Sequence, residues 1–355
     1  MKAIINTKYI KNIFLFTVLF CSATIVVAQD DEEEGSKFSF SGSIDAYYRA
    51  NLNAPNGEDA QAPGSSFANL PGFALGMANV IGAYEGEKVG FVADLVFGPR
   101  GTDAIFASPM YSATGNIVNQ LYAYWNVSDA VTLTFGNFNT FLGYEVISPV
   151  ANFNYSTSYL FSYGPFSHTG LKADFALSDD FSLMLAVMNP TDLTEFNPTG
   201  QYAWGAQLGY SGQYLNLLID NGSYEVDFTG GFDLSDTFFL GLNAAYFDGD
   251  EEDGVGSFAG VAVYPQLATS DNFTIGLRGE YFAETDFFGA IGDEFDADGD
   301  ASVFAVTLTG SATIGDLMIK PELRLDSASE EVFIDSDGNP MGGLTSFVLA
   351  AIYSF

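Results

Sequence analysis

Charged and apolar side chains alternate along residues 317–326, and the alternation keeps every charge on one face. The odd positions include Leu323 and Leu325, while the even positions from 320 onward carry Lys320, Glu322, Arg324 and Asp326. Successive side chains of a β-strand point to opposite faces of the sheet. Such a strand fits a soluble sandwich with its charges in water, or a transmembrane barrel with its charges in the lumen.

The same segregation of charge recurs in strand-like segments along the whole chain. Ile44 and Tyr48 lie on the face opposite Asp45 and Arg49, for example. A Lys or Arg on the lipid face of a barrel costs about 2–4 kcal/mol at the membrane midplane, so consistent segregation favours a barrel. The side chains that we expect to line its lumen are Asp45, Arg49, Asp94, Lys172, Asp174, Glu225, Asp227, Arg278, Glu280, Lys320, Glu322, Arg324 and Asp326.

Hydropathy also favours a barrel. Hydrophobic residues make up 48% of the chain, and Phe and Tyr number 34 and 19. After residue 28, no segment reaches the roughly eighteen consecutive apolar residues that a spanning helix needs. In lipid, only helices and closed barrels satisfy every backbone N–H and C=O. The sequence therefore predicts an all-β fold, a closed antiparallel transmembrane β-barrel over residues 37–355.

The N-terminal segment has the layout of a secretory signal. Lys2, Lys8 and Lys11 precede an apolar run over 13–27, and Ala28 ends it. We expect a cleaved signal peptide over residues 1–28, an acidic periplasmic tail over 29–36, and export to the outer membrane of a Gram-negative bacterium. The one cysteine, Cys21, lies in the signal, so no disulfide is expected after cleavage.

About sixteen strands are expected, with fourteen and eighteen as alternatives. Short turns alternate with longer loops rich in Gly, Asn and acid, as in barrels with periplasmic turns and outer loops. Asn221-Gly222 departs from this alternation, because it predicts a tight hairpin where an outer loop is expected. The expected strands are 37–49, 72–84, 88–98, 116–127, 131–139, 166–177, 180–189, 201–210, 213–220, 223–234, 237–247, 257–267, 271–283, 301–314, 317–327 and 344–355.

Net charge excludes two classes of partner. Eight Lys and Arg remain after the signal against 45 Asp and Glu, a net charge of about −37. Nucleic acid and anionic membrane surfaces would be repelled. With no cysteine after the signal and one histidine in the chain, no cofactor is expected, and a zinc site is disfavoured.

Residues 136–170 resemble a signature of the OmpL-like β-barrel porin family of Bacteroidetes-type outer membranes. The resemblance rests on Gly136, Phe138, Gly143-Tyr144-Glu145, Asn152, Asn154-Tyr155-Ser156, Ser158, Pro165 and His168-Thr169-Gly170. Thr157 stands where relatives often carry a basic residue. The resemblance extends as architecture over 37–355 and implies a passive outer-membrane channel of undefined solute.

The final strand, ending on Phe355, resembles the signal read by the barrel-assembly machinery. Outer-membrane lipid, that machinery and a homo-oligomer are the expected partners.

The longest connection, residues 140–165, has two interpretations. Its Gly, Asn, Ser and aromatic content is typical of a loop that folds on itself. We expect it to bend inward and narrow the pore, with Glu145, Asn152 and Asn154 available to line it. The alternative is an ordinary surface loop.

Two further groups of residues could carry chemistry. His168 is the only histidine, so a catalytic triad would have to use it, but a structural role is favoured and no enzyme is predicted. Asp296, Asp298 and Asp300 have the alternate spacing of a calcium loop, and residues 335–339 repeat it with one amide. Neither has the complete loop pattern, and the alternatives are weak calcium binding or a solvated acidic loop.

The predicted function is that of an outer-membrane porin for passive diffusion of small polar solutes or ions. Excess acid at the mouth would give it a weak preference for cations. One rival is a channel for an apolar ligand, favoured by Leu218, Val348 and Ile352 on the expected lumen face. A plugged structural or adhesin barrel is the other rival.

Overall fold

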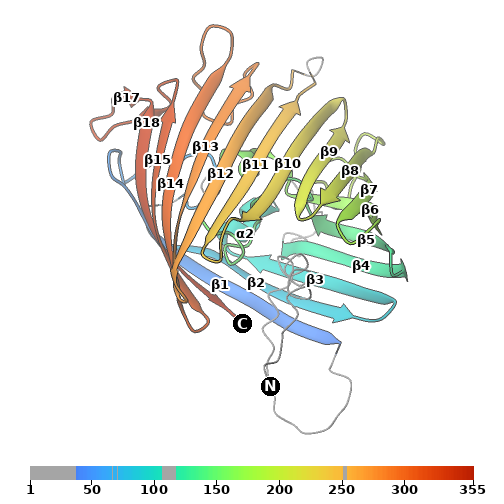
Figure 1. Ribbon diagram of the computed structural model, residues 1–355. Helices are drawn as coiled ribbons and strands as arrows, with labels where there is room; N and C mark the ends of the chain where they lie inside the picture. Colours follow the sequence, from blue (N-terminus) through green and yellow to red (C-terminus); the bar gives the residue numbers. More distant parts are fainter. Residues whose placement is uncertain (1–36, 66, 70, 106–116, 251–253) are drawn as a thin grey trace.

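A computed structural model describes residues 37–355 except 66, 70, 106–116 and 251–253. Within this part of the chain, sixteen antiparallel strands form a closed barrel (Figure 1). Both the barrel and its strand number were predicted correctly. The predicted signal peptide, 1–28, and acidic tail, 29–36, lie outside the described residues. The barrel strands are β1 (Phe38–Asn51), β2 (Gly72–Glu85), β3 (Val89–Phe97), β4 (Val118–Ser128), β5 (Val131–Asn139), β6 (Ser167–Ala176), β7 (Phe181–Met188), β8 (Ala203–Tyr210), β9 (Gln213–Asp220), β10 (Ser223–Asp233), β11 (Phe238–Asp248), β12 (Ser257–Ser270), β13 (Phe273–Thr285), β14 (Ala301–Ile314), β15 (Leu317–Ala328) and β18 (Gly343–Ser354).

Each strand pairs with its neighbours in sequence, and β18 closes the ring on β1. The closing register runs from Ser43↔Ser354 to Asn51↔Ser346, so β1 begins and β18 ends at the same end of the barrel. Short turns also lie at this end. At the opposite end, Asn221 and Gly222 have φ values of 47° and 92°, as a two-residue turn with left-handed residues requires. This hairpin directly joins β9 to β10.

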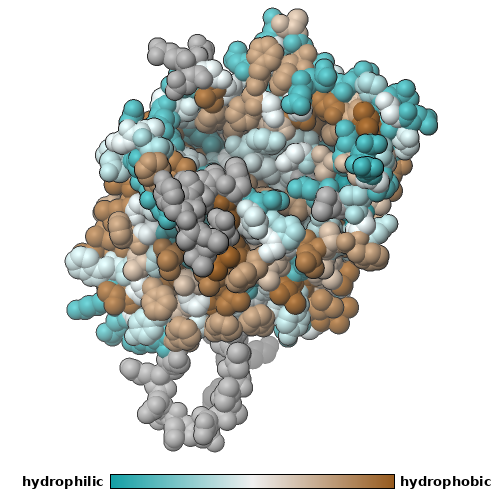
Figure 2. Space-filling view, turned by 180° about the vertical axis from the view of Figure 1, so that it is seen from behind, coloured by the Kyte–Doolittle hydropathy of each residue, from teal (hydrophilic) through white to brown (hydrophobic). Residues whose placement is uncertain are grey.

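The two faces of the strands differ as the alternation requires. On β15, Leu325 is 46% exposed on the outer face, whereas Arg324 and Asp326 are 1% and 3% exposed on the inner face. Apolar side chains cover much of the outer wall, with hydrophilic residues gathered toward the end remote from the termini (Figure 2). An apolar outer band is the surface that a barrel presents to lipid.

Several connections at the long-loop end contain structure of their own. The helix α2 (Pro99–Ala104) follows β3 and lies within the ring of strands (Figure 1), and α3 (Tyr159–Tyr163) follows in the connection between β5 and β6. The strands β16 (Phe333–Ile334) and β17 (Pro340–Met341) form a small separate hairpin. No helix in the described part of the chain has the length and apolar character of a membrane span.

Candidate functional site

The connection between β5 and β6 folds into the barrel and packs against the inner faces of the strands. We call residues 140–166 the inner loop. Its ends meet where the N–H of Thr140 donates to the carbonyl of Phe166 at 3.0 Å. Gly143 has a φ of 82°, a left-handed conformation that glycine adopts without strain. Ser158 caps α3 by accepting the N–H of Phe161, and Tyr155 and Tyr159 are fully buried.

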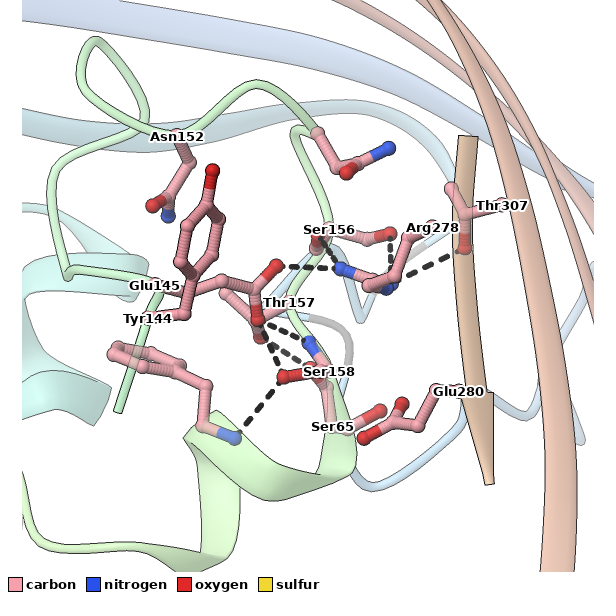
Figure 3. A network of polar contacts seen from close by, with 12 residues as sticks. Ser65, Tyr144, Glu145, Asn152, Ser156, Thr157, Ser158, Arg278, Glu280 and Thr307 are labelled. Atoms are coloured by element: carbon pink, nitrogen blue, oxygen red, sulfur yellow. Dashed lines mark hydrogen bonds and ion pairs between the residues drawn. The ribbon is translucent and has the colours of Figure 1, made fainter. Parts of the chain in front are cut away.

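A buried ion pair joins the inner loop to β13 (Figure 3). Glu145 of the loop accepts a hydrogen bond from Nη1 of Arg278 at 2.8 Å, and the two side chains are 3% and 0% exposed. The other carboxylate oxygen of Glu145 accepts the N–H of Ser158 at 2.7 Å. Arg278 also donates to the carbonyl of Ser156 at 2.6 Å and to the hydroxyl of Thr307 at 3.1 Å. One arginine therefore links two strands to two parts of the loop.

Two wall carboxylates accept backbone N–H groups of the inner loop. Glu322 accepts from Tyr155 at 2.8 Å and from Ser156 at 3.1 Å. Glu280 accepts from Tyr159 at 3.0 Å and from Leu160 at 2.9 Å, which are the first residues of α3. The first N–H groups of a helix have no partner within the helix, so Glu280 satisfies donors that would otherwise be orphaned inside the barrel.

Basic side chains bind the loop carbonyls. Lys320 donates to the carbonyl oxygens of Pro149, at 2.9 Å, and Asn152. Arg324 donates to the carbonyl of Thr157 at 2.8 Å, while Asp326 pairs with it at 2.8 Å. Irregular backbone at membrane depth needs such partners, because it has no regular hydrogen-bonding ladder of its own.

Two other segments complete the packing. Arg100 of α2 donates to the carbonyl of Ile147 at 2.8 Å and to that of Tyr155 at 2.9 Å. The connection between β1 and β2 supplies Ser65, whose hydroxyl accepts from Arg324 at 2.6 Å. On β1, Asp45 accepts a hydrogen bond from the hydroxyl of Tyr155. The loop is thus held by groups from β1, β13, β15 and α2.

The strands β9 to β11 contact the beginning of the inner loop through one carboxylate. Asp227 of β10 accepts the N–H of Gly143 at 3.0 Å, and its carboxylate is also bonded to the amides of Asn216 and Asn243. Glu225, two residues earlier on the same face, is 5% exposed, and its carboxylate accepts no hydrogen bond within the part of the chain that the structure describes. Together with Gly143, Gly164 and Phe161, it lines a small cavity of about 10 Å³, which has room for one water molecule.

Comparison with known proteins assigns this architecture. The model of a family described as "Putative beta-barrel porin-2, OmpL-like" matches residues 37–355. The chain belongs to this porin family. No curated protein matches the sequence.

Solved porin structures share the fold of this family member at low identity. The outer membrane channel DcaP of Acinetobacter baumannii has a TM-score of 0.60 and 13% identity, covering 93% of this chain and 100% of that one. The anion-selective porin from Comamonas acidovorans has a TM-score of 0.56 and 10% identity, covering 90% and 99%. OmpT of Vibrio cholerae in its trimer form has a TM-score of 0.54 and 11% identity, covering 90% and 99%. The porin is an outer-membrane β-barrel channel by family and by fold.

Most of the predicted lumen residues of this porin face inward but are covered by protein. Of the thirteen, eleven are at most 7% exposed. Lys172 and Asp174 are the exceptions, with side chains 26% and 42% exposed and paired at 3.1 Å. Asp94 is bonded to Asn79 and Asn119 of the neighbouring strands at 3.3 and 2.7 Å. Arg49 donates to the carbonyl of Gln61 at 3.0 Å.

The three predicted constriction residues of the inner loop are also buried. Glu145, Asn152 and Asn154 are 4%, 6% and 1% exposed. Asn152 closes a turn by accepting the N–H of Val146 at 2.8 Å, and Asn154 donates to Thr309 at 2.7 Å. In this structure they contact the loop itself and the wall rather than open water.

Sequence reasoning missed Arg100, Ser65 and the threonines of β14 as parts of this site. Arg100 had a usable signal, because it is one of only eight Lys and Arg after residue 28 and directly follows a strand. Ser65, Thr307 and Thr309 carry none, because small hydroxyl residues occur throughout such sequences.

His168 lies at the junction of the inner loop and β6. Its Nε2 is 3.0 Å from the hydroxyl of Thr140, and the rings of Phe138 and Phe141 flank it at centroid distances of 6.2 and 5.2 Å. These contacts are with a hydroxyl and two apolar rings. The family and the structural neighbours are porins, which are channels rather than enzymes.

The acidic outer segments use their carboxylates to fold turns. Asp296 accepts the N–H groups of Asp298 and Asp300 at 2.9 and 3.0 Å, which lowers the pKa of its exposed carboxyl. Asp335 accepts from Asp337 and Asn339 at 2.8 and 2.9 Å in the same way. Among the described residues, no three Asp, Glu, His or Cys side chains converge as metal ligands. Calcium binding therefore stays a prediction.

Proposed function

We propose that this porin passes small polar solutes and ions and weakly prefers cations. The observation that carries the preference is the location of its positive charge. Five basic side chains, Arg49, Arg100, Arg278, Lys320 and Arg324, are at most 1% exposed and are bonded to backbone or carboxylate oxygens. Buried and paired cations attract mobile anions weakly.

The remaining cations are few. Lys172 is paired with Asp174, and Lys37 and Lys88 lie at the end of the barrel that carries the short turns. No Lys or Arg is therefore left exposed on the long loops, because Arg100 in the connection between β3 and β4 is buried and the sequence contains no other after residue 28. Those loops expose several carboxylates, including Asp293, Glu294 and Asp298. An acidic mouth with no exposed basic side chain raises the local cation concentration.

Polar side chains on the inner face from β4 to β9 support passage of polar solutes. Tyr124, Asn126, Thr132, Asp174 and Gln207 are all partly exposed there. The inner loop is bonded mainly to the other side of the barrel, so these side chains are the ones that solute would meet. We infer that the path lies between them and the loop.

Reversal potentials of purified protein in a planar bilayer test the preference. A gradient of potassium chloride at low ionic strength should give a potential of the sign for cation preference. The preference should fade at high salt, because the Debye length falls from about 30 Å at 0.01 M to about 3 Å at 1 M. Anion preference at low salt would contradict the proposal.

The inner loop is proposed to set the width of the path. Deleting residues 151–158 should enlarge the single-channel conductance, since the segment from Asn152 to Ser158 is at most 6% exposed within the barrel except for partly exposed Phe153. Folded protein with unchanged conductance would leave the loop with no role in the constriction. Migration of unheated samples in detergent gels verifies that the barrel has closed.

A plugged barrel is the second candidate function. It is favoured by the burial of eleven inward charges and by the packing of α2 and the inner loop inside the ring. Purified, folded protein that never conducts in a planar bilayer would support it. The channel for an apolar ligand is less favoured, because Leu218, Val348 and Ile352 are covered, at most 5% exposed.

Three accompanying proposals concern partners and ions. We infer that the barrel-assembly machinery inserts the chain by binding β18. We also infer a homo-oligomer, because the solved structures with this fold include the trimer form of OmpT. Weak calcium binding between the Asp296 and Asp335 turns is the third. Calorimetry that registers no heat with millimolar calcium would contradict the calcium proposal.

A further inference from the structure

Two carboxylates stand side by side on β10, and only one of them is used in the fold. Asp227 is saturated by three hydrogen bonds, one of which fixes the inner loop at Gly143. Glu225 is almost as deeply buried, at 5% exposure, but no described residue donates a hydrogen bond to its carboxylate. A carboxylate without a donor is costly to keep inside a protein. Glu225 therefore has unused capacity to bind a positive partner.

The space in front of Glu225 is small and closely bounded. The cavity of about 10 Å³ lies between β10, β11 and the inner loop, lined by Glu225 and Asp227 on the wall and by Gly143 and Gly164 on the loop. A cavity of about this volume holds one water molecule or one ion of similar size. A β-carbon at Gly164 would lie 3.7 Å from Oε1 of Glu225, so glycine helps to keep this space open.

We propose that Glu225 and this cavity form a binding site for one monovalent cation at the edge of the ion path, on the strand next to β9. The carboxylate supplies the charge, and the size of the cavity limits the occupant to a single alkali-metal or ammonium ion. One free carboxylate balances the charge of a monovalent ion but only half the charge of a divalent ion, which proteins bind with several carboxylate and carbonyl oxygens. Such a site would contribute to the proposed preference for cations. Its role in conduction rests on the proposed function.

Conductance as a function of salt tests the site on the path. A single-ion site makes the conductance of the native channel saturate as potassium chloride is raised. In Glu225→Gln, which has the same shape and breaks no bond of the fold, the saturation constant should rise by about fivefold or more, the effect of one unit charge about 4 Å away in bulk water. Glu225→Asp keeps the charge and should retain most of the saturation.

Glu294→Gln is the matched control, because it makes the same chemical change at an exposed position of an outer loop, away from the cavity. It should alter selectivity through the general field while leaving the saturation constant near the native value. Equal saturation in the native protein and in Glu225→Gln would overturn the proposed place of the site on the path.

Binding can be tested without conduction. Crystals soaked in thallium(I) nitrate should show one anomalous peak in contact with the carboxylate of Glu225, absent from Glu225→Gln. If the native protein shows no peak, the site is refuted and the cavity holds water. A peak that remains in Glu225→Gln refutes the site as well. A native channel without cation preference would refute the proposed function instead, and the thallium result would still decide the site.

Discussion

Neutralising Glu145 should release the inner loop from the wall. In Glu145→Gln the guanidinium of Arg278 loses the one carboxylate of the described residues that lies at hydrogen-bond distance, and both side chains are almost completely buried. The N–H of Ser158 keeps at best a neutral acceptor in place of a charged one. Removing one partner of a buried ion pair costs about 3–5 kcal/mol, because the other charge stays buried and uncompensated.

This loss of free energy can be measured in one of two ways, depending on whether the loop can leave the wall alone. If the loop can leave the wall while the barrel stays closed, its opening equilibrium shifts by a factor of roughly 100 to 4,000, since each 1.4 kcal/mol is tenfold. Single-channel recordings should then show substates of larger conductance that are rare in the native protein. If the loop cannot leave alone, the free energy of unfolding falls by a similar amount, measured by denaturant unfolding in detergent.

Glu294→Gln is the matched control, because it makes the same chemical change at an exposed position of an outer loop. A cycle with Arg278→Met tests the pair directly, and the double variant should recover about 0.5–3 kcal/mol relative to the sum of the single changes. The reasoning fails if Glu145→Gln matches Glu294→Gln in both conductance and unfolding midpoint.

Two smaller predictions follow from neighbouring contacts. Gly76→Ala should destabilise the barrel by about 1–3 kcal/mol, because the new β-carbon would overlap the carboxylate of Asp45, whereas Gly57→Ala, with open space around it, should be silent in the same unfolding assay. Burial raises the pKa of Asp192, in the loop after β7, to about 6. The N–H groups of Ser167 and Phe166 donate to its carboxylate and offset part of this rise in pKa. The folded state then binds a proton that the unfolded state has released, so unfolding free energy should fall as pH rises from about 4 to about 6. Asp192→Asn should flatten this slope, and an unchanged slope would exclude Asp192 as its source.

The barrel could be predicted from the sequence because its physical code is local. A period of two, turn residues and charge segregation fix strand and face for each segment separately, and β5, β9 and β14 begin and end where expected. The predicted end of β12 was three residues short of Ser270, because the polar residues Thr269 and Ser270 look like a turn. The short β16–β17 hairpin was missed, since two-residue strands leave no period to detect.

The candidate site could be predicted only in part, because its contacts join distant segments. The inward face of Arg278 followed from alternation, but its partner Glu145 is 133 residues away. Alternation tells which side chains face the lumen and not whether water or protein fills it. For this reason seven of the thirteen residues that we expected to line an open pore are found bonded to the loop, namely Asp45, Asp227, Arg278, Glu280, Lys320, Glu322 and Arg324.

The wall charges of β13 and β15 are best explained by the backbone of the inner loop. Loop N–H groups bond to Glu280 and Glu322, and loop carbonyls bond to Arg278, Lys320 and Arg324. Irregular backbone inside a barrel leaves many such groups without partners, and each orphan costs about 1–3 kcal/mol. Alternating acid and base along one strand therefore supplies acceptors and donors in turn, and fixes the position of the loop.

Lys320→Met tests this explanation against the view that the wall charges serve ion flow. Lys320 donates to the carbonyls of Pro149 and Asn152, so its loss should lower the free energy of unfolding by about 1.5–3 kcal/mol, the range for hydrogen bonds to a charged group. Lys172→Met removes the same charge from a half-exposed pair and should alter ion selectivity with little change in stability. If the two variants instead lose equal stability, or if Lys320→Met shifts selectivity alone, the charges of β15 act on ions and not on the loop.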